Sequence, residues 1–117
     1  LDKIVPTLYR QQEAVEAIKN DLLVYVVEGE KDVENLRKLG LTATCNPMGA
    51  GKWRASYSET LRGGDLIIIP DKDNAGQAHA FQVAQSLHGK AARVRVLELP
   101  DPGKDITDWL QSGGTPD

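Results

Sequence analysis

The stretch IIIPDKDNAG, residues 67–76, joins three isoleucines to a proline, two aspartates one residue apart and a glycine. A continuous run of β-branched residues is typical of a strand that is buried on both faces. Pro70 lacks a backbone N–H, which suits a strand that is ending. Side chains alternate along an extended chain, so Asp71 and Asp73 can point the same way. The sequence therefore predicts a buried strand that ends in two carboxylates.

Outward from this stretch, helical and extended patterns alternate along the whole chain. The spacing of apolar residues predicts helices at residues 11–20, 32–39, 53–61, 75–87 and 105–110. Apolar or alternating runs predict strands at residues 22–27, 41–45, 65–69 and 93–99. Short connections between alternating helices and strands are typical of an open parallel sheet that is covered by helices. We therefore expect an α/β fold with about four mainly parallel strands.

The composition is that of one ordinary globular domain, with 117 residues of which 40% are apolar and 26% are charged. Cys45 is the single cysteine, which excludes an internal disulfide and favours a reducing, cytoplasmic environment. No apolar run approaches the roughly 20 residues that a membrane span needs. The net charge of −3 gives no argument for binding nucleic acid. Because the chain begins at Leu1 and its single methionine is Met48, we expect it to be a piece of a longer protein.

Acidic residues also follow the first predicted strand, in the stretch YVVEGEKD. In open α/β sheets, ligands bind beyond the carboxyl ends of the strands. If the two strands are neighbours, Glu28, Asp71 and Asp73 converge, and a hard cation such as Mg²⁺ would offset their repulsion. Acids at a helix N-terminus also stabilise the helix dipole by about 0.3–1 kcal/mol, which alone accounts for Glu30 or Asp32. That second explanation gives no reason for acids at two separate strand ends.

Two familiar ion-binding and phosphate-binding loops are excluded by the residues at their key positions. An EF-hand loop lacks two oxygen ligands here, because Ala75 and Gln82 stand in their places, and a strand precedes it instead of a helix. A Walker A loop needs glycine where Asn46 stands and Ser or Thr where Trp53 stands. The D-K-D motif taken alone is also compatible with a phosphatase that uses a nucleophilic aspartate. That alternative gives no role to the acids after the first strand.

With EGEKD after one strand and DKDNAG after a later one, the chain resembles the TOPRIM domain, the metal-dependent module of primases, topoisomerases and some nucleases. The family pattern is a glutamate after the first strand and a D-x-D after the third, which Glu28, Asp71 and Asp73 match. The segments TATCNPMGAGKW, PDKDNAGQAH and GKDITDWL are most similar to the primase branch of phages, plasmids and mobile elements. The resemblance implies a Rossmann-like TOPRIM domain at residues 22–117, with an N-terminal helical segment, residues 1–21, packed on its edge.

The resemblance also implies Mg²⁺-dependent nucleotidyl or phosphoryl transfer on DNA or RNA, as the catalytic core of a DNA primase-like protein. A helicase or other ATPase domain is expected in the same full-length chain, and the isolated domain is expected to be inactive alone. Asp71 and Asp73 would hold Mg²⁺, which Mn²⁺ can replace, and Glu28 would contact the metal and act as general base. The primase motifs imply a second tier of acids, which are Asp32, Asp105 and Asp108. Topoisomerase is disfavoured, because no tyrosine has the context of a nucleophile.

Cationic side chains near these motifs predict contacts with phosphates or nucleic acid, and they are Lys31, Lys52, Arg54 and Lys72. Trp53 either stacks on a base or packs on the domain. His79 is either a ligand or a half-buried helix residue. Two other functions stay open: a TOPRIM nuclease that cleaves DNA, and a non-catalytic module that binds nucleic acid or nucleotide for an attached ATPase. The sequence does not predict a template preference or an oligomeric state.

Overall fold

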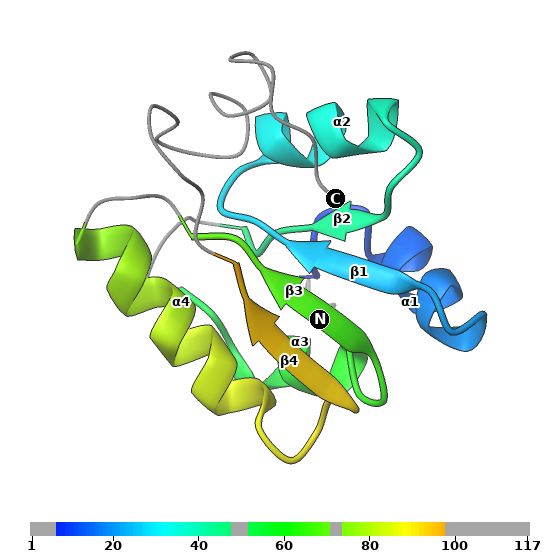
Figure 1. The fold of residues 1–117 in the computed structure, drawn as a ribbon. Helices are drawn as coiled ribbons and strands as arrows, with labels where there is room; N and C mark the ends of the chain where they lie inside the picture. Colours follow the sequence, from blue (N-terminus) through cyan, green and yellow to red (C-terminus); the bar gives the residue numbers. More distant parts are fainter. Residues whose placement is uncertain (1–6, 48–51, 71–73, 98–117) are drawn as a thin grey trace, which may run out of the picture.

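The computed structural model describes residues 7–47, 52–70 and 74–97, which form a parallel sheet with helices on both faces (Figure 1). The strands lie in the order β2-β1-β3-β4, and their bounds are β1 (Leu23–Val26), β2 (Ala43–Thr44), β3 (Asp65–Ile68) and β4 (Arg93–Val96). The helices of the described ranges are α1 (Gln11–Lys19), α2 (Glu30–Lys38), α3 (Ala55–Thr60) and α4 (Asn74–Leu87). The prediction of an α/β fold with about four parallel strands is confirmed.

Alternate side chains of the central strand β1 enter two separate cores, one on each face of the sheet. Val24 and Val26 belong to a core that also contains buried residues of α1, α3 and α4. Tyr25 and Val27 belong to the core under α2. Figure 1 shows the same layers, with α2 on one side of the sheet and α3 and α4 on the other. Burial on both faces explains why β1 reads as a continuous apolar run.

The elements begin and end close to the predicted positions. The largest shifts at a helix start are of two residues: α2 begins at Glu30 instead of residue 32, and α3 begins at Ala55 instead of residue 53. Gly29 is extended and precedes the helix, so Glu30 and Asp32 both lie in its first turn, where acids stabilise the helix dipole. The predicted helix at residues 105–110 lies outside the described residues. In the described part of the chain, no helix is long and apolar enough to cross a membrane.

The helix α1 shares the larger core with the sheet. Ala14 and Ala17 on its inner face are buried, and both pack in the cluster that contains Val24. The helix contacts β1 and β2, so it lies beside the edge of the sheet that β2 forms. The division of the chain into residues 1–21 and 22–117 stays a prediction.

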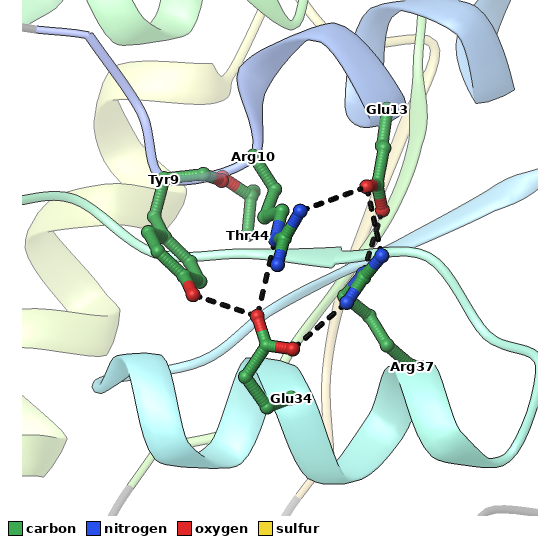
Figure 2. Close-up of polar contacts among 6 residues, drawn as sticks. All are labelled: Tyr9, Arg10, Glu13, Glu34, Arg37 and Thr44. Atoms are coloured by element: carbon green, nitrogen blue, oxygen red, sulfur yellow. Dashed lines mark hydrogen bonds and ion pairs between the residues drawn. The ribbon is translucent and has the colours of Figure 1, made fainter.

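A polar network joins α1 to α2 around this edge of the sheet (Figure 2). Glu34 on α2 accepts hydrogen bonds from Tyr9 Oη at 2.6 Å, Arg10 Nε at 3.1 Å and Arg37 Nη1 at 2.8 Å. Arg37 also donates from Nε and Nη2 to the Glu13 carboxylate, at 2.9 and 3.1 Å. The hydrogen bond from Tyr9 is the main cause that lowers the pKa of the Glu34 carboxyl to about 2.

The backbone of Tyr9 extends this connection along β2. The Tyr9 N–H donates to the Cys45 carbonyl at 2.9 Å, and Thr44 Oγ1 donates to the Tyr9 carbonyl at 2.7 Å. The outer edge of a short strand is a site where another chain can pair, and covering that edge prevents such pairing. The segment before α1 therefore covers the edge of β2 and fixes Tyr9 where its hydroxyl reaches Glu34.

A Tyr9→Phe substitution is expected to raise the pKa of Glu34, because it removes the hydrogen bond that lowers it most. A carboxyl whose pKa is lowered by folding adds stability above its unfolded pKa, and that stability is lost as the pH falls to the folded pKa. Wild-type stability should therefore fall between about pH 4.5 and pH 2, and the variant should show less of this fall. NMR titration of the Glu34 carboxyl and urea midpoints at each pH measure both effects.

Glu59 provides the internal control for this titration. Lys90 and Arg62 lower its pKa, and neither contacts Tyr9 in the described network. The pKa of Glu59 should be the same in both proteins. An unchanged pKa of Glu34 in the variant would show that the Tyr9 hydroxyl does not hold this carboxylate.

Candidate functional site

The carboxyl ends of β1 and β3 lie side by side at the centre of the sheet (Figure 1). The two strands stay paired to their ends, since the Ile69 N–H donates to the Val26 carbonyl at 2.9 Å. Glu28 follows β1, and Pro70 is buried after β3. From β1 the chain crosses to β2 on one side, and from β3 it crosses to β4 on the other. This is the type of switch point at which open α/β sheets bind ligands.

Glu28 lies in the bend between β1 and α2, and His79 lies on α4. Val24 and Val26, which precede Glu28 on β1, face the core that contains α4. Glu28 is partly buried, and His79 on α4 is 5% exposed. Burial lowers the pKa of His79, and the Glu28 carboxylate acts in the opposite direction as the smaller cause. Burial is therefore the dominant influence on the pKa of this imidazole.

Three residues are predicted to bind the metal: Glu28, Asp71 and Asp73. Of these, Glu28 alone lies in the described part of the chain. Outside the described residues lie Asp71, Lys72, Asp73, Asp105 and Asp108. In residues 7–47, 52–70 and 74–97, no three His, Cys, Asp or Glu side chains gather as they would around a metal ion. Carboxylates are the oxygen ligands that Mg²⁺ prefers, so the residue types fit this ion. The metal-binding role of these acids stays a prediction.

Asp32 lies on the α2 side of the sheet. It is 6% exposed in the first turn of α2, two residues after the exposed Glu30. Burial, together with the charges of Glu30 and Asp32, raises the pKa of the Cys45 thiol to about 12. Cys45 is a buried member of the core under α2, at 2% exposure. The role of Asp32 as a second-tier acid stays a prediction.

Trp53 is a core residue and does not offer a face to a base. It is 7% exposed, and its ring packs edge-on against Tyr57 with 5.4 Å between the ring centroids. Its Nε1–H donates to Ser58 Oγ at 2.9 Å, and that hydroxyl is 2.7 Å from Ser86 Oγ on α4. Of the two alternatives for Trp53, base stacking is wrong, because packing and the indole N–H both direct the ring inward.

Three of the predicted phosphate-binding cations are described, and all three are exposed: Lys31, Lys52 and Arg54. Helices that connect parallel strands begin at the carboxyl edge of the sheet. Lys31 is in the first turn of α2, at the carboxyl edge of the sheet where Glu28 lies. Lys52 and Arg54 precede α3, whose Ser58 meets Ser86 near the end of α4. The buried Trp53 fixes the backbone between Lys52 and Arg54. Contacts between these cations and phosphates stay predictions.

Two features of this region were not predicted from the sequence. One is the network around Glu34, for which the sequence offers a tyrosine and two arginines but no pattern that pairs them. The other is the full burial of His79, which is 5% exposed. A signal for the burial of His79 does exist, because His79, Val83 and Leu87 recur at helical spacing on the inner face of α4.

The comparisons with known proteins agree with this fold. The model of a family described as Toprim-like matches residues 25–110. Among curated proteins, no match is found. Among solved structures, the Escherichia coli primase catalytic core is similar with a TM-score of 0.71 and 24% sequence identity over 92% of this chain and 35% of that chain. The catalytic core of DnaG gives a TM-score of 0.67 and 26% identity, over 91% of this chain and 35% of that chain.

A third similar structure contains bacteriophage T7 lagging-strand DNA polymerase interacting with primase domains bound to an RNA/DNA hybrid and dTTP. The TM-score is 0.56 and the identity 26%, over 78% of this chain and 48% of that chain. The chain thus spans 35% to 48% of the length of these three structures. The family match covers most of the 117 residues, and the primase cores share the parallel sheet. The chain therefore belongs to the Toprim-like family, with the fold of primase catalytic cores.

Proposed function

We propose that this chain is the metal-dependent catalytic core of a DNA primase-like protein, which transfers nucleotidyl or phosphoryl groups on nucleic acid. One observation carries the proposal: β1, which leads into Glu28, pairs in parallel with β3, after which the sequence continues as Asp71-Lys72-Asp73. Membership of the Toprim-like family and the likeness to primase catalytic cores support it.

The proposed roles follow from the chemistry of the side chains. Asp71 and Asp73, with Glu28, would supply carboxylate oxygens to Mg²⁺ or Mn²⁺. When bound, the metal stabilises negative charge on a phosphoryl group and orients the attacking hydroxyl. Glu28 is proposed to take the proton of that hydroxyl as the general base. Further acids are assigned by the resemblance alone, and they are Asp32, Asp105 and Asp108.

The cationic side chains are proposed to bind the phosphates of nucleotide or template. They are Lys31, Lys52, Arg54 and Lys72. Ammonium and guanidinium groups bind phosphate oxygens by charge-assisted hydrogen bonds. Exposed cations would serve equally well in a non-catalytic module that binds nucleic acid, and such a module is the second candidate function. A TOPRIM nuclease uses the same acids and differs from a primase in its product.

The whole protein is proposed to supply what this chain lacks. Because the chain spans 35% to 48% of the primase structures that it resembles, the template-binding surface would lie largely in other domains. We propose a cytoplasmic protein of DNA replication that carries a helicase or other ATPase domain, binds DNA, RNA and nucleotides, and needs those domains for activity.

Two substitutions in the full-length protein, Glu28→Gln and Asp71→Asn, distinguish the proposed general base from a proposed metal ligand. Glutamine keeps the size of Glu28 but cannot accept a proton at neutral pH. Primer synthesis should fall by about 10² to 10⁴, the usual contribution of general-base catalysis, with a modest loss of Mn²⁺ affinity. Asp71→Asn removes a charged ligand, so activity and Mn²⁺ binding should be lost together. Primer assays and Mn²⁺ titrations measure the two effects.

Glu30→Gln is the matched control, because Glu30 is exposed two residues from Glu28 and has no assigned role. It should keep wild-type activity. Residual activity within about tenfold of wild type for Glu28→Gln would contradict the general-base assignment. Full activity in both Glu28→Gln and Asp71→Asn would favour the binding module, and DNA cleavage in place of primer synthesis would favour the nuclease.

Asp73→Asn is expected to leave the metal-free chain as stable as wild type or more stable, because it removes one of several repelling charges. Asp73 precedes the first residue of α4, Asn74, and asparagine caps a helix about as well as aspartate. The substitution thus removes the charge and keeps a residue type that suits a helix N-terminus. Urea denaturation without metal and a Mn²⁺ titration are the measurements. A clear loss of metal-free stability, with Mn²⁺ affinity unchanged, would assign Asp73 a structural role instead.

A further inference from the structure

The face of the sheet under α2 is only partly covered by the helices that the structure describes. Of these helices, α2 alone adds buried residues to the core on this face, and it contacts β2 at one edge of the sheet. The opposite face has buried residues from α1, α3 and α4. Parallel sheets have helices over both faces. The half of the α2 face that β3 and β4 form therefore calls for a further cover.

This half of the face is polar at its amino end and apolar at its carboxyl end. At the amino end, Arg95 Nη2 on β4 donates to Asp65 Oδ1 on β3 at 3.0 Å. Ile67 packs against the core under α2 and stays half-buried. The pairing of β4 with β3 continues to Leu97, whose N–H donates to the Ile68 carbonyl at 2.8 Å. Alternation from Arg95 places Leu97 on the same face as Ile67, at 37% exposure. We call Ile67 and Leu97 the β3–β4 patch.

The sequence after Leu97 contains a short apolar face that suits this patch. The predicted helix at residues 105–110 has three apolar residues at the spacing of one helix face, which we call the C-terminal apolar face: Ile106, Trp109 and Leu110. Seven residues, 98–104, connect Leu97 to this helix. An extended chain of that length spans up to about 23 Å, and the stretch PDPG at residues 100–103 favours a turn. The connection is therefore long enough for the helix to return to the patch.

We propose that the C-terminal apolar face docks on the β3–β4 patch, with the Trp109 indole against Ile67 and Leu97. The contact removes apolar surface of both partners from water. A segment joined to the patch by a short connection has a high effective concentration there, which favours it over a second copy of the chain or a separate domain.

The docked helix would also distinguish two of the second-tier acids. At about 100° per residue, Asp108 lies about 150° from the centre of the C-terminal apolar face, whereas Asp105 lies about 90° from it. Asp108 would therefore face water, and Asp105 would lie beside the sheet. This consequence for the choice of acids rests on the proposed function, whereas the docking itself needs no metal.

Nuclear Overhauser contacts in the 117-residue chain without metal test the docking directly. We expect contacts from the Trp109 ring to the methyl groups of Ile67 and Leu97, and Trp109→Ala should shift those methyl signals. Val94 and Val96 line the groove between β4 and α4 on the opposite face, so their signals should stay in place. Contacts from Trp109 to these valines, or to neither face, would overturn the proposal.

A matched pair of substitutions, Leu97→Asp and Val96→Asp, leaves Trp109 intact. The two residues are neighbours, are 37% and 48% exposed, and lie on opposite faces of the sheet. A carboxylate under the indole should release it, so acrylamide should quench tryptophan fluorescence more strongly in Leu97→Asp than in wild type. Val96→Asp should match wild type, and Trp53, which is 7% exposed, provides the same weakly quenched background in all three proteins. Unchanged quenching in Leu97→Asp, or an equal rise in both variants, would contradict the docking.

Other occupants of the patch give different results. A second copy of the chain would make the Ile67 and Leu97 methyl signals depend on protein concentration, without contacts to Trp109 of the same chain. A separate domain would leave Trp109 open to acrylamide in the 117-residue chain. Either result would overturn the proposal. Because these measurements contain no metal, a failure to bind Mn²⁺ would count against the proposed function and leave the docking result unchanged.

Discussion

The parallel pairing of β1 with β3 is the interaction on which the rest of this structure depends. Its register joins Leu23 to Asp65 and Val26 to Ile68. Burying one Val, Leu or Ile side chain stabilises a fold by about 1.5–3 kcal/mol, and Val24 and Leu66, both 0% exposed, contribute to the core from adjacent strands. A slip of one residue would exchange the side chains that face the two cores, so that Val24 and Tyr25 would each enter the wrong one. The same pairing brings the end of β1, which leads into Glu28, beside the end of β3. Stability and the proposed chemistry therefore depend on one constraint.

Polar contacts at the margins of the sheet connect the helices that the two cores hold. The network around Glu34 joins α1 to α2, and the hydrogen bonds from Trp53 through Ser58 to Ser86 join the loop before α3 to α4. An exposed ion pair contributes little to stability by itself. The contacts around Glu34 instead fix how α1 meets α2. The buried Trp53 fixes the backbone from which the neighbouring cations project.

The fold was predictable because its signals are local. Alternation and β-branched runs identified the strands, and the acids at two strand ends indicated where they meet. The shortest strand, β2, spans Ala43–Thr44, fewer residues than predicted, because its outer edge pairs with the side chain and backbone around Tyr9 instead of with a strand. The environment of Trp53 was not predictable, since it depends on Ser86, which meets Ser58 from 28 residues away. His79 shows a weaker form of this limit, because its helical spacing with Val83 and Leu87 is a local signal for its burial.

The central claim is that Glu28 and the D-K-D after β3 share one divalent cation. Paramagnetic broadening of backbone amide signals by Mn²⁺ tests it directly, because broadening falls steeply with distance from the ion. The account predicts that the signals of Glu28, Gly29, Asp71 and Asp73 broaden at the lowest Mn²⁺ concentrations, and weakly, since no substrate phosphate completes the site. The acids of the surface networks, Glu13, Glu34 and Glu59, are the internal comparison. Uniform broadening, or broadening that begins at those acids, would contradict the claim.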